Sequence, residues 1–169
     1  MTIGTFQATR FHDFCCGHRV VGHEGKCRNL HGHNYRVFFT VEAGRVPMGG
    51  AGLSPLPEKQ LDKVGRVVDF SVIKELGVWL EEYWDHKMLM WSQDPLLAIM
   101  DDQVQPLTGP VGIVEVPFNP TAENIAQFLV ETVGPRVLPE GIRLVKVVIE
   151  ETRKCSASYE VFRRSTTAS

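Results

Sequence analysis

The stretch "KCRNLHGHNY", residues 26–35, holds a cysteine and two histidines whose spacing suits metal chemistry. His31 and His33 are two residues apart at the entrance of an alternating run, so in a strand their side chains point to the same face. Two such imidazoles can share one Zn²⁺ ion at distances of about 2.0–2.1 Å. His18, at the end of the preceding predicted strand, is well placed as a third ligand, and three neutral imidazoles with one vacant position form a catalytic type of zinc site. The alternative is a turn with exposed imidazoles.

Cys27 is open to two interpretations. It could close the metal site as a fourth ligand, which gives a structural zinc site, or it could stand beside the metal as a reactive thiolate. The spacing alone leaves both open. The other three cysteines, Cys15, Cys16 and Cys155, are expected to be inert thiols.

The dipeptide Asp85–His86 offers an acid–base pair. Asp85 can orient the imidazole of His86, which can then polarise Cys27 or exchange protons with it. The alternative is a helix end at which His86 stabilises the last carbonyls. Glu150 and Glu151 are adjacent on a predicted strand and point to opposite faces, so at most one of them faces a pocket. A solvated strand end is the alternative for both.

Several strands and two helices must position these residues. Ser71 is the expected N-cap of a helix that runs to about Tyr83, and Thr121 is the expected N-cap of a second helix within residues 119–139. The four main strands, two before the helices and two after, indicate an α+β fold with one four-stranded antiparallel sheet and both helices on one face. The open sheet edges favour oligomerisation. Alternation and β-branched content predict strands, the third and fourth of them short, at residues 5–18, 34–43, 65–70, 111–118, 143–152 and 156–164. In the second of these strands, the alternating residues Tyr35, Val37, Phe39 and Val41 are expected to form one buried face.

Length and composition predict a single domain over residues 1–169. The net charge of −2 gives no reason to expect nucleic acid or an anionic membrane as a partner, and no uninterrupted apolar run is long enough to span a bilayer. The first residues lack the apolar region of a signal peptide, so a reduced, cytoplasmic protein is expected. A Gly/Pro-rich loop is predicted at about residues 45–64 and a polar tail at about residues 164–169.

Five motifs occur in an order that resembles one enzyme family. They are "KCRNLHGHNY", "VVDFSVIKE", "WDHKML", "NPTAENIA" and "VIEET", and together they resemble the 6-pyruvoyl-tetrahydropterin synthases and 6-carboxytetrahydropterin synthases over about residues 5–163. Cys27 and His31 are separated by three residues, a spacing that resembles that of the bacterial carboxy enzymes of the queuosine (7-deazaguanine) pathway. A related branch that only cleaves dihydroneopterin has glutamate in place of this cysteine. The resemblance implies zinc ligands His18, His31 and His33, a general base Cys27 activated by Asp85 and His86, and pterin-contacting residues Glu151, which is often counted in the proton relay, and Thr121.

The implied activity is a zinc-dependent carbon–carbon cleavage. It would convert 7,8-dihydroneopterin triphosphate into 6-carboxy-5,6,7,8-tetrahydropterin, acetaldehyde and triphosphate. The alternatives are 6-pyruvoyl-tetrahydropterin synthase activity from the same residues, and a non-catalytic zinc-stabilised module. The resemblance also implies the tunnelling fold (T-fold), in which three subunits close their sheets into a barrel and two trimers stack into a hexamer with active sites between subunits.

Three departures from the family pattern stand out. This chain reads "FCCGH" where the family usually reads Phe-x-Ala-Ala-His, the Gly/Pro-rich loop at residues 45–64 is longer than in compact members, and the segment at residues 92–112 is extended. None of them removes a catalytic residue. The triphosphate needs cationic partners, and Arg19, Lys26 and Arg28 are candidates, although solvated surface charge is the alternative for each.

Overall fold

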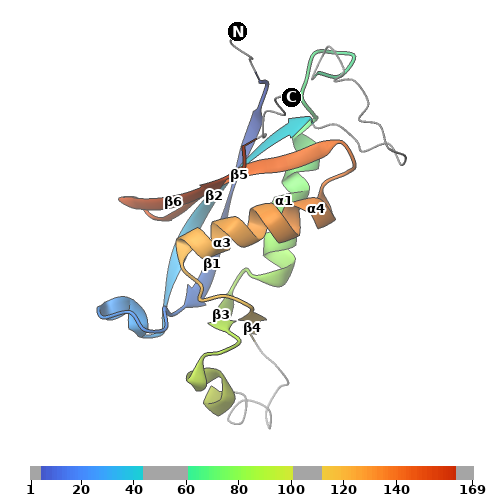
Figure 1. The fold of residues 1–169 in the computed structure, drawn as a ribbon. Helices are drawn as coiled ribbons and strands as arrows, with labels where there is room; N and C mark the ends of the chain where they lie inside the picture. Colours follow the sequence, from blue (N-terminus) through green and yellow to red (C-terminus); the bar gives the residue numbers. More distant parts are fainter. Residues whose placement is uncertain (1–4, 44–60, 101–111, 163–169) are drawn as a thin grey trace, which may run out of the picture.

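The computed structural model describes residues 5–43, 61–100 and 112–162 (Figure 1). The predicted polar tail lies outside these residues, as does most of the predicted Gly/Pro-rich loop. Among the described residues, no helix combines the length and the apolar character needed to cross a lipid bilayer.

The core of the fold is one mixed sheet in the order β4-β3-β1-β2-β5-β6. Its four main strands, β1, β2, β5 and β6, pair antiparallel as predicted. The prediction of a sheet with only four strands was wrong, because β3 and β4 pair parallel beside β1 and extend the sheet to six strands. The strands are β1 (Ala8–His18), β2 (His31–Ala43), β3 (Lys87–Trp91), β4 (Ile113–Val116), β5 (Ile142–Thr152) and β6 (Cys155–Glu160).

Both predicted helices cover the same face of the sheet, at a steep angle to one another (Figure 1). The first is α1 (Phe70–Tyr83). The second begins as α3 (Ala122–Phe128) and continues through the π-helical turn η2 (Leu129–Val133) into α4 (Gly134–Val137). Thr121 is confirmed as the N-cap of α3, because its hydroxyl accepts a hydrogen bond from the Asn124 N–H at 3.3 Å.

The start of α1 differs from the prediction. Residues 65–69 form a turn and a cap rather than a strand, and the N-cap is Asp69 instead of Ser71. The Asp69 carboxylate accepts hydrogen bonds from both the Ser71 N–H at 2.9 Å and the Ser71 hydroxyl at 2.7 Å. A carboxylate at this position satisfies a free helical N–H and interacts favourably with the helix dipole.

Alternation along β2 sets which side chains enter the core. Tyr35, Val37, Phe39 and Val41, the four positions predicted to face inward, are each at most 1% exposed. The same alternation on β1 buries Phe14, Cys16 and His18 on the helix-covered face. In the antiparallel register His18 lies opposite His31, and Cys16 lies opposite His33. The strand pairing therefore gathers three histidines on one face.

Gly77 is expected to be essential for packing α1 onto β1. A Cβ atom at this position would lie 2.7 Å from Nδ1 and 2.8 Å from Cγ of His12, too close for either to adjust without moving the strand. We expect Gly77→Ala to lower the free energy of unfolding in urea by about 1–2 kcal/mol, since overpacking outweighs the helix propensity that alanine gains. In the His12→Ala background the clash is absent, so there the same change should stabilise the protein. Equal stability of Gly77→Ala and the wild type would contradict this packing.

Candidate active site

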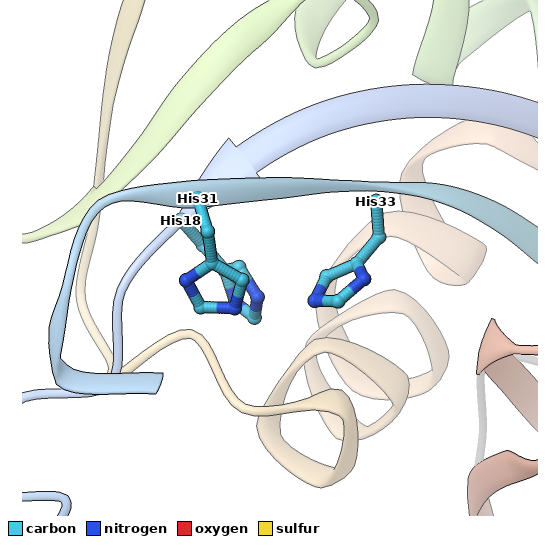
Figure 2. A group of neighbouring side chains, drawn as sticks. All are labelled: His18, His31 and His33. Atoms are coloured by element: carbon cyan, nitrogen blue, oxygen red, sulfur yellow. The ribbon is translucent and has the colours of Figure 1, made fainter. Parts of the chain in front are cut away.

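Three imidazoles from β1 and β2 converge at the end of the hairpin (Figure 2). His18 ends β1, while His31 and His33 lie on β2, and one ring nitrogen of each lies within 4.8 Å of the others. His18 is 1% exposed, and the other two are half-buried. The predicted histidine cluster is therefore present, in a geometry that can hold a metal ion.

Backbone carbonyls orient two of these rings. Nδ1 of His18 lies 2.6 Å from the Pro120 carbonyl oxygen, and Nδ1 of His31 lies 2.8 Å from that of Asn29. A carbonyl only accepts, so each Nδ1 carries a proton and donates it, which leaves the lone pair of a neutral ring on Nε2. This is the arrangement that a metal-binding histidine requires.

The third ring is ready for a ligand by a different route. Nε2 of His33 is buried and has no hydrogen-bond partner among the described residues, a costly state for a polar atom unless something binds it. Burial lowers the pKa of both His18 and His33, so both rings are neutral at neutral pH, as metal binding demands. The donor set fits a divalent metal ion such as zinc.

Tyr35 and Glu151 complete the surroundings of the histidines. The Tyr35 hydroxyl lies 3.1 Å from Nε2 of His18 and donates to Oε1 of Glu151 at 3.4 Å. That carboxylate oxygen is also 3.4 Å from Nε2 of His18 and 3.6 Å from Nε2 of His33. Burial raises the pKa of Tyr35 far above its usual range, so the hydroxyl keeps its proton. The sequence predicted Tyr35 only as a buried strand residue and gave it no role in the site, although alternation places it on the same face as His33.

A pocket of about 310 Å³ adjoins the histidine cluster. It brings together four of the eight predicted site residues, His18, Cys27, Thr121 and Glu151. Cys27 lies half-buried on the 3-10 turn η1 (Lys26–Arg28), whose position is fixed because the Val20 N–H donates to the Cys27 carbonyl at 2.8 Å. The pocket also contains residues that the sequence analysis missed, among them His23, Glu123, Cys155 and Ser156.

A comparison with known proteins matches the chain to one family. Residues 7–161 match the family described as 6-pyruvoyl tetrahydropterin synthase. The chain belongs to this family. A curated relative from Rickettsia typhi, named 6-carboxy-5,6,7,8-tetrahydropterin synthase, is 32% identical over 88% of this chain and 96% of its own length. One of the same name from Aquifex aeolicus is 32% identical over 80% of this chain and 76% of its own.

Solved structures share the family fold. An uncharacterized protein from Wolinella succinogenes has a TM-score of 0.70 at 24% identity, with 94% of this chain and 99% of that chain covered. The 6-pyruvoyl tetrahydropterin synthase of Caenorhabditis elegans has a TM-score of 0.54 at 22% identity, with 96% and 99% covered. At these identities the likeness concerns the fold alone.

Within one chain, Asp85 and His86 lie outside this pocket. Oδ1 of Asp85 accepts from the Cys15 N–H at 2.8 Å, and its Oδ2 lies 2.7 Å from Nδ1 of His86. Burial alone would raise the pKa of Asp85, but these two hydrogen bonds outweigh it and lower the pKa, so the carboxylate stays ionised. His86 is 80% exposed and lines other pockets, none of which contains Cys27. The predicted pair is present, yet one chain does not bring it to the thiol.

The backbone at His86 is unusual. Its φ of 56° lies in the left-handed region, which non-glycine residues seldom adopt, and the His86 N–H donates to the Cys15 carbonyl at 2.6 Å. Such a conformation costs energy and persists where the surroundings enforce it, often at functional positions. The alternative role, in which His86 stabilises the last carbonyls of α1, is filled by Lys87, whose ammonium donates to the Glu82 carbonyl at 2.7 Å.

A buried ion pair joins β1 to the extended segment after β3. The guanidinium of Arg19 donates to both carboxylate oxygens of Asp94, at 2.6 and 2.9 Å, and reaches the Arg28 carbonyl at 3.5 Å. The Asp94 side chain is 1% exposed, whereas that of Arg19 is 23% exposed. Arg19 therefore serves the fold next to His18, and its charge is already neutralised by Asp94.

The unequal exposure of this pair predicts unequal costs. Arg19→Met leaves a carboxylate buried without its counter-ion and should lower the free energy of unfolding by about 3–5 kcal/mol. Asp94→Asn should cost less, because the exposed part of Arg19 can be hydrated and the amide oxygen can still accept from the Leu96 N–H. Urea unfolding of both variants measures the difference. A larger loss in Asp94→Asn would contradict the assignment.

Proposed function

We propose that this chain is a zinc-dependent 6-carboxy-5,6,7,8-tetrahydropterin synthase that converts 7,8-dihydroneopterin triphosphate into 6-carboxy-5,6,7,8-tetrahydropterin, acetaldehyde and triphosphate. The observation that carries the proposal is the cluster of three histidines, two of them oriented by backbone carbonyls, beside a pocket that also contains Cys27 and Glu151. The curated relatives named 6-carboxy-5,6,7,8-tetrahydropterin synthase support the choice of reaction.

The chain supplies the following roles in this proposal. His18, His31 and His33 hold zinc, which when bound supplies a Lewis acid for the hydroxyls of the substrate side chain. Cys27 exchanges protons on that side chain. The Glu151 carboxylate, held by the Tyr35 hydroxyl, accepts the two parallel N–H donors of the pterin edge, and Thr121 lines the pocket next to it.

We further propose that the active site is completed between subunits of a T-fold hexamer. In one chain Cys27 and His86 line separate pockets, so a neighbouring chain is the natural source of the pair that activates the thiol. On the helix-free face of the sheet Phe11 is 51% exposed and lies 5.9 Å from Phe38, ring centre to ring centre, which suits a subunit contact. The four free cysteines agree with a reduced, cytoplasmic setting.

The test is the incubation of the zinc-loaded protein with 7,8-dihydroneopterin triphosphate and the identification of products by mass. Carboxytetrahydropterin together with acetaldehyde supports the proposal. Loss of triphosphate without acetaldehyde would instead indicate the pyruvoyl product, which the same residues could form. If neither product is formed, the proposed reaction is wrong.

A further inference from the structure

One wall of the pocket is a turn in which the proposed reaction gives a role to Cys27 alone. We propose that this turn, residues 23–28, is the subsite for the triphosphate of the substrate. His23 donates a hydrogen bond from the pocket wall, and Lys26 and Arg28 supply positive charge on either side of Cys27. The inference rests on the proposed function, because the anion is part of that substrate.

The ring of His23 is fixed with one donor free. The Gly25 N–H donates to Nδ1 of His23 at 2.8 Å, and a neutral imidazole that accepts at Nδ1 carries its proton on Nε2. The ring also packs against Gly25, where a Cβ atom would lie 3.0 Å from Cε1. Within the described part of the chain, Nε2 has no hydrogen-bond partner, and His23 lines the same pocket as Cys27. A preorganised N–H without an acceptor is suited to a phosphate oxygen.

The cations of the turn are also available. Lys26 and Arg28 are exposed on η1, and neither forms an ion pair with a carboxylate of the described residues. Arg19, the third candidate from the sequence, is less available, because its Nε and Nη2 are both bound to the carboxylate of Asp94, which neutralises its charge. Only Glu24 opposes the two cations within the turn.

The two sides of the pocket have opposite hydrogen-bonding character. Glu151 on β5 and Glu123 on α3 offer only acceptors when ionised, whereas the turn offers the Nε2 donor of His23 in the pocket wall. Lys26 and Arg28 lie outside the lining, exposed on either side of Cys27. A ligand with N–H donors at one end and an anion at the other matches this division. The pterin edge faces Glu151, and the triphosphate faces the turn.

The experiment compares two ligands that differ only in the anion. Dissociation constants of 7,8-dihydroneopterin and 7,8-dihydroneopterin triphosphate are measured by calorimetry on zinc-loaded Cys27→Ala protein, which prevents turnover through the proposed thiol. The dissociation constant of 7,8-dihydroneopterin divided by that of the triphosphate measures how much the triphosphate adds to the affinity. His23→Asp keeps an acceptor for the Gly25 N–H but removes the Nε2 donor. Lys26→Ala/Arg28→Ala removes the two exposed cations and leaves the backbone hydrogen bonds of the turn in place.

We expect each of these variants to lower the ratio by about 10-fold or more, as for the loss of hydrogen bonds to a charged group. The control is Lys74→Ala, which removes an exposed cation of α1 and should leave the ratio unchanged. An unchanged ratio in Lys26→Ala/Arg28→Ala and in His23→Asp would overturn the subsite even if the wild type makes the expected product. Failure of both ligands to bind at all would instead refute the proposed function, and the subsite with it.

Discussion

Cys27→Ala is expected to lower the turnover of 7,8-dihydroneopterin triphosphate by about 10²–10⁴-fold while the zinc content stays at the wild-type level. The reason is positional. Cys27 lines the pocket together with Glu151 and Thr121, but its sulfur is not part of the cluster formed by the three histidines. The measurement combines product formation by mass with zinc content by elemental analysis of the same sample.

The control for this prediction is a second thiol in the same pocket. Cys155 is exposed at the start of β6 and lines the pocket with Cys27, so Cys155→Ala changes a thiol there without removing the proposed base. It should keep turnover within a few-fold of the wild type. If Cys27→Ala lost zinc and stability together, Cys27 would be a fourth ligand. The protein would then be a zinc-stabilised module rather than an enzyme.

His33→Ala is expected to abolish both zinc retention and turnover. Its Nε2 is buried and lacks a hydrogen-bond partner among the described residues. Removal of the ring should therefore remove a proposed metal ligand without breaking a hydrogen bond at that atom. In the wild type, free zinc at a hundredfold excess over its dissociation constant should stabilise the fold by about 2.7 kcal/mol. In His33→Ala that stabilisation should nearly vanish, and thermal unfolding with and without zinc measures it.

The matched control is a histidine outside the cluster. His12 lies on β1 and packs against Gly77 of α1, and it shares no pocket with the three ligands. His12→Ala should therefore keep one zinc per chain and a zinc-dependent rise in unfolding temperature. Full zinc binding by His33→Ala would show that the metal is held elsewhere.

The sequence predicted those elements whose pattern is local and long. The alternation from Tyr35 to Val41 predicted β2 and its buried face, and the Thr121 cap predicted the start of α3; both are confirmed. The parallel pair β3–β4 was not predicted as part of the sheet. β3 has only five residues, Lys87 and four apolar residues without alternation, and its pairing with β1 depends on contacts about 70 residues apart in sequence. The apolar residues at 65–70 suggested a strand, but the hydrogen bonds of Asp69 make the segment a helix cap.

In the candidate site, too, local patterns could be predicted from the sequence and long-range contacts could not. His31 and His33 were predicted from spacing, because period two places both on one face, and His18 followed from pairing of the two strands. No sequence pattern indicates the Pro120 carbonyl that orients His18, since a backbone atom leaves no residue type to recognise. The Arg19–Asp94 pair was equally hidden, because opposite charges 75 residues apart are common in any chain.

The placement of the three clustered histidines on one hairpin has a consequence for how a metal centre would assemble there. His18 and His31 face each other across the β1–β2 pair and are joined by a short segment, so an ion bound by both would close a small loop at a modest entropic cost. The hairpin itself supplies Asn29, which orients His31, but two other surrounding groups come from distant parts of the chain, Pro120 before α3 and Glu151 on β5. If these histidines hold a metal ion as proposed, its capture would require only the hairpin, whereas its final affinity would require the whole domain. A chain that has just formed β1 and β2 would then bind the metal weakly, and the later docking of α3 and β5 would strengthen the binding.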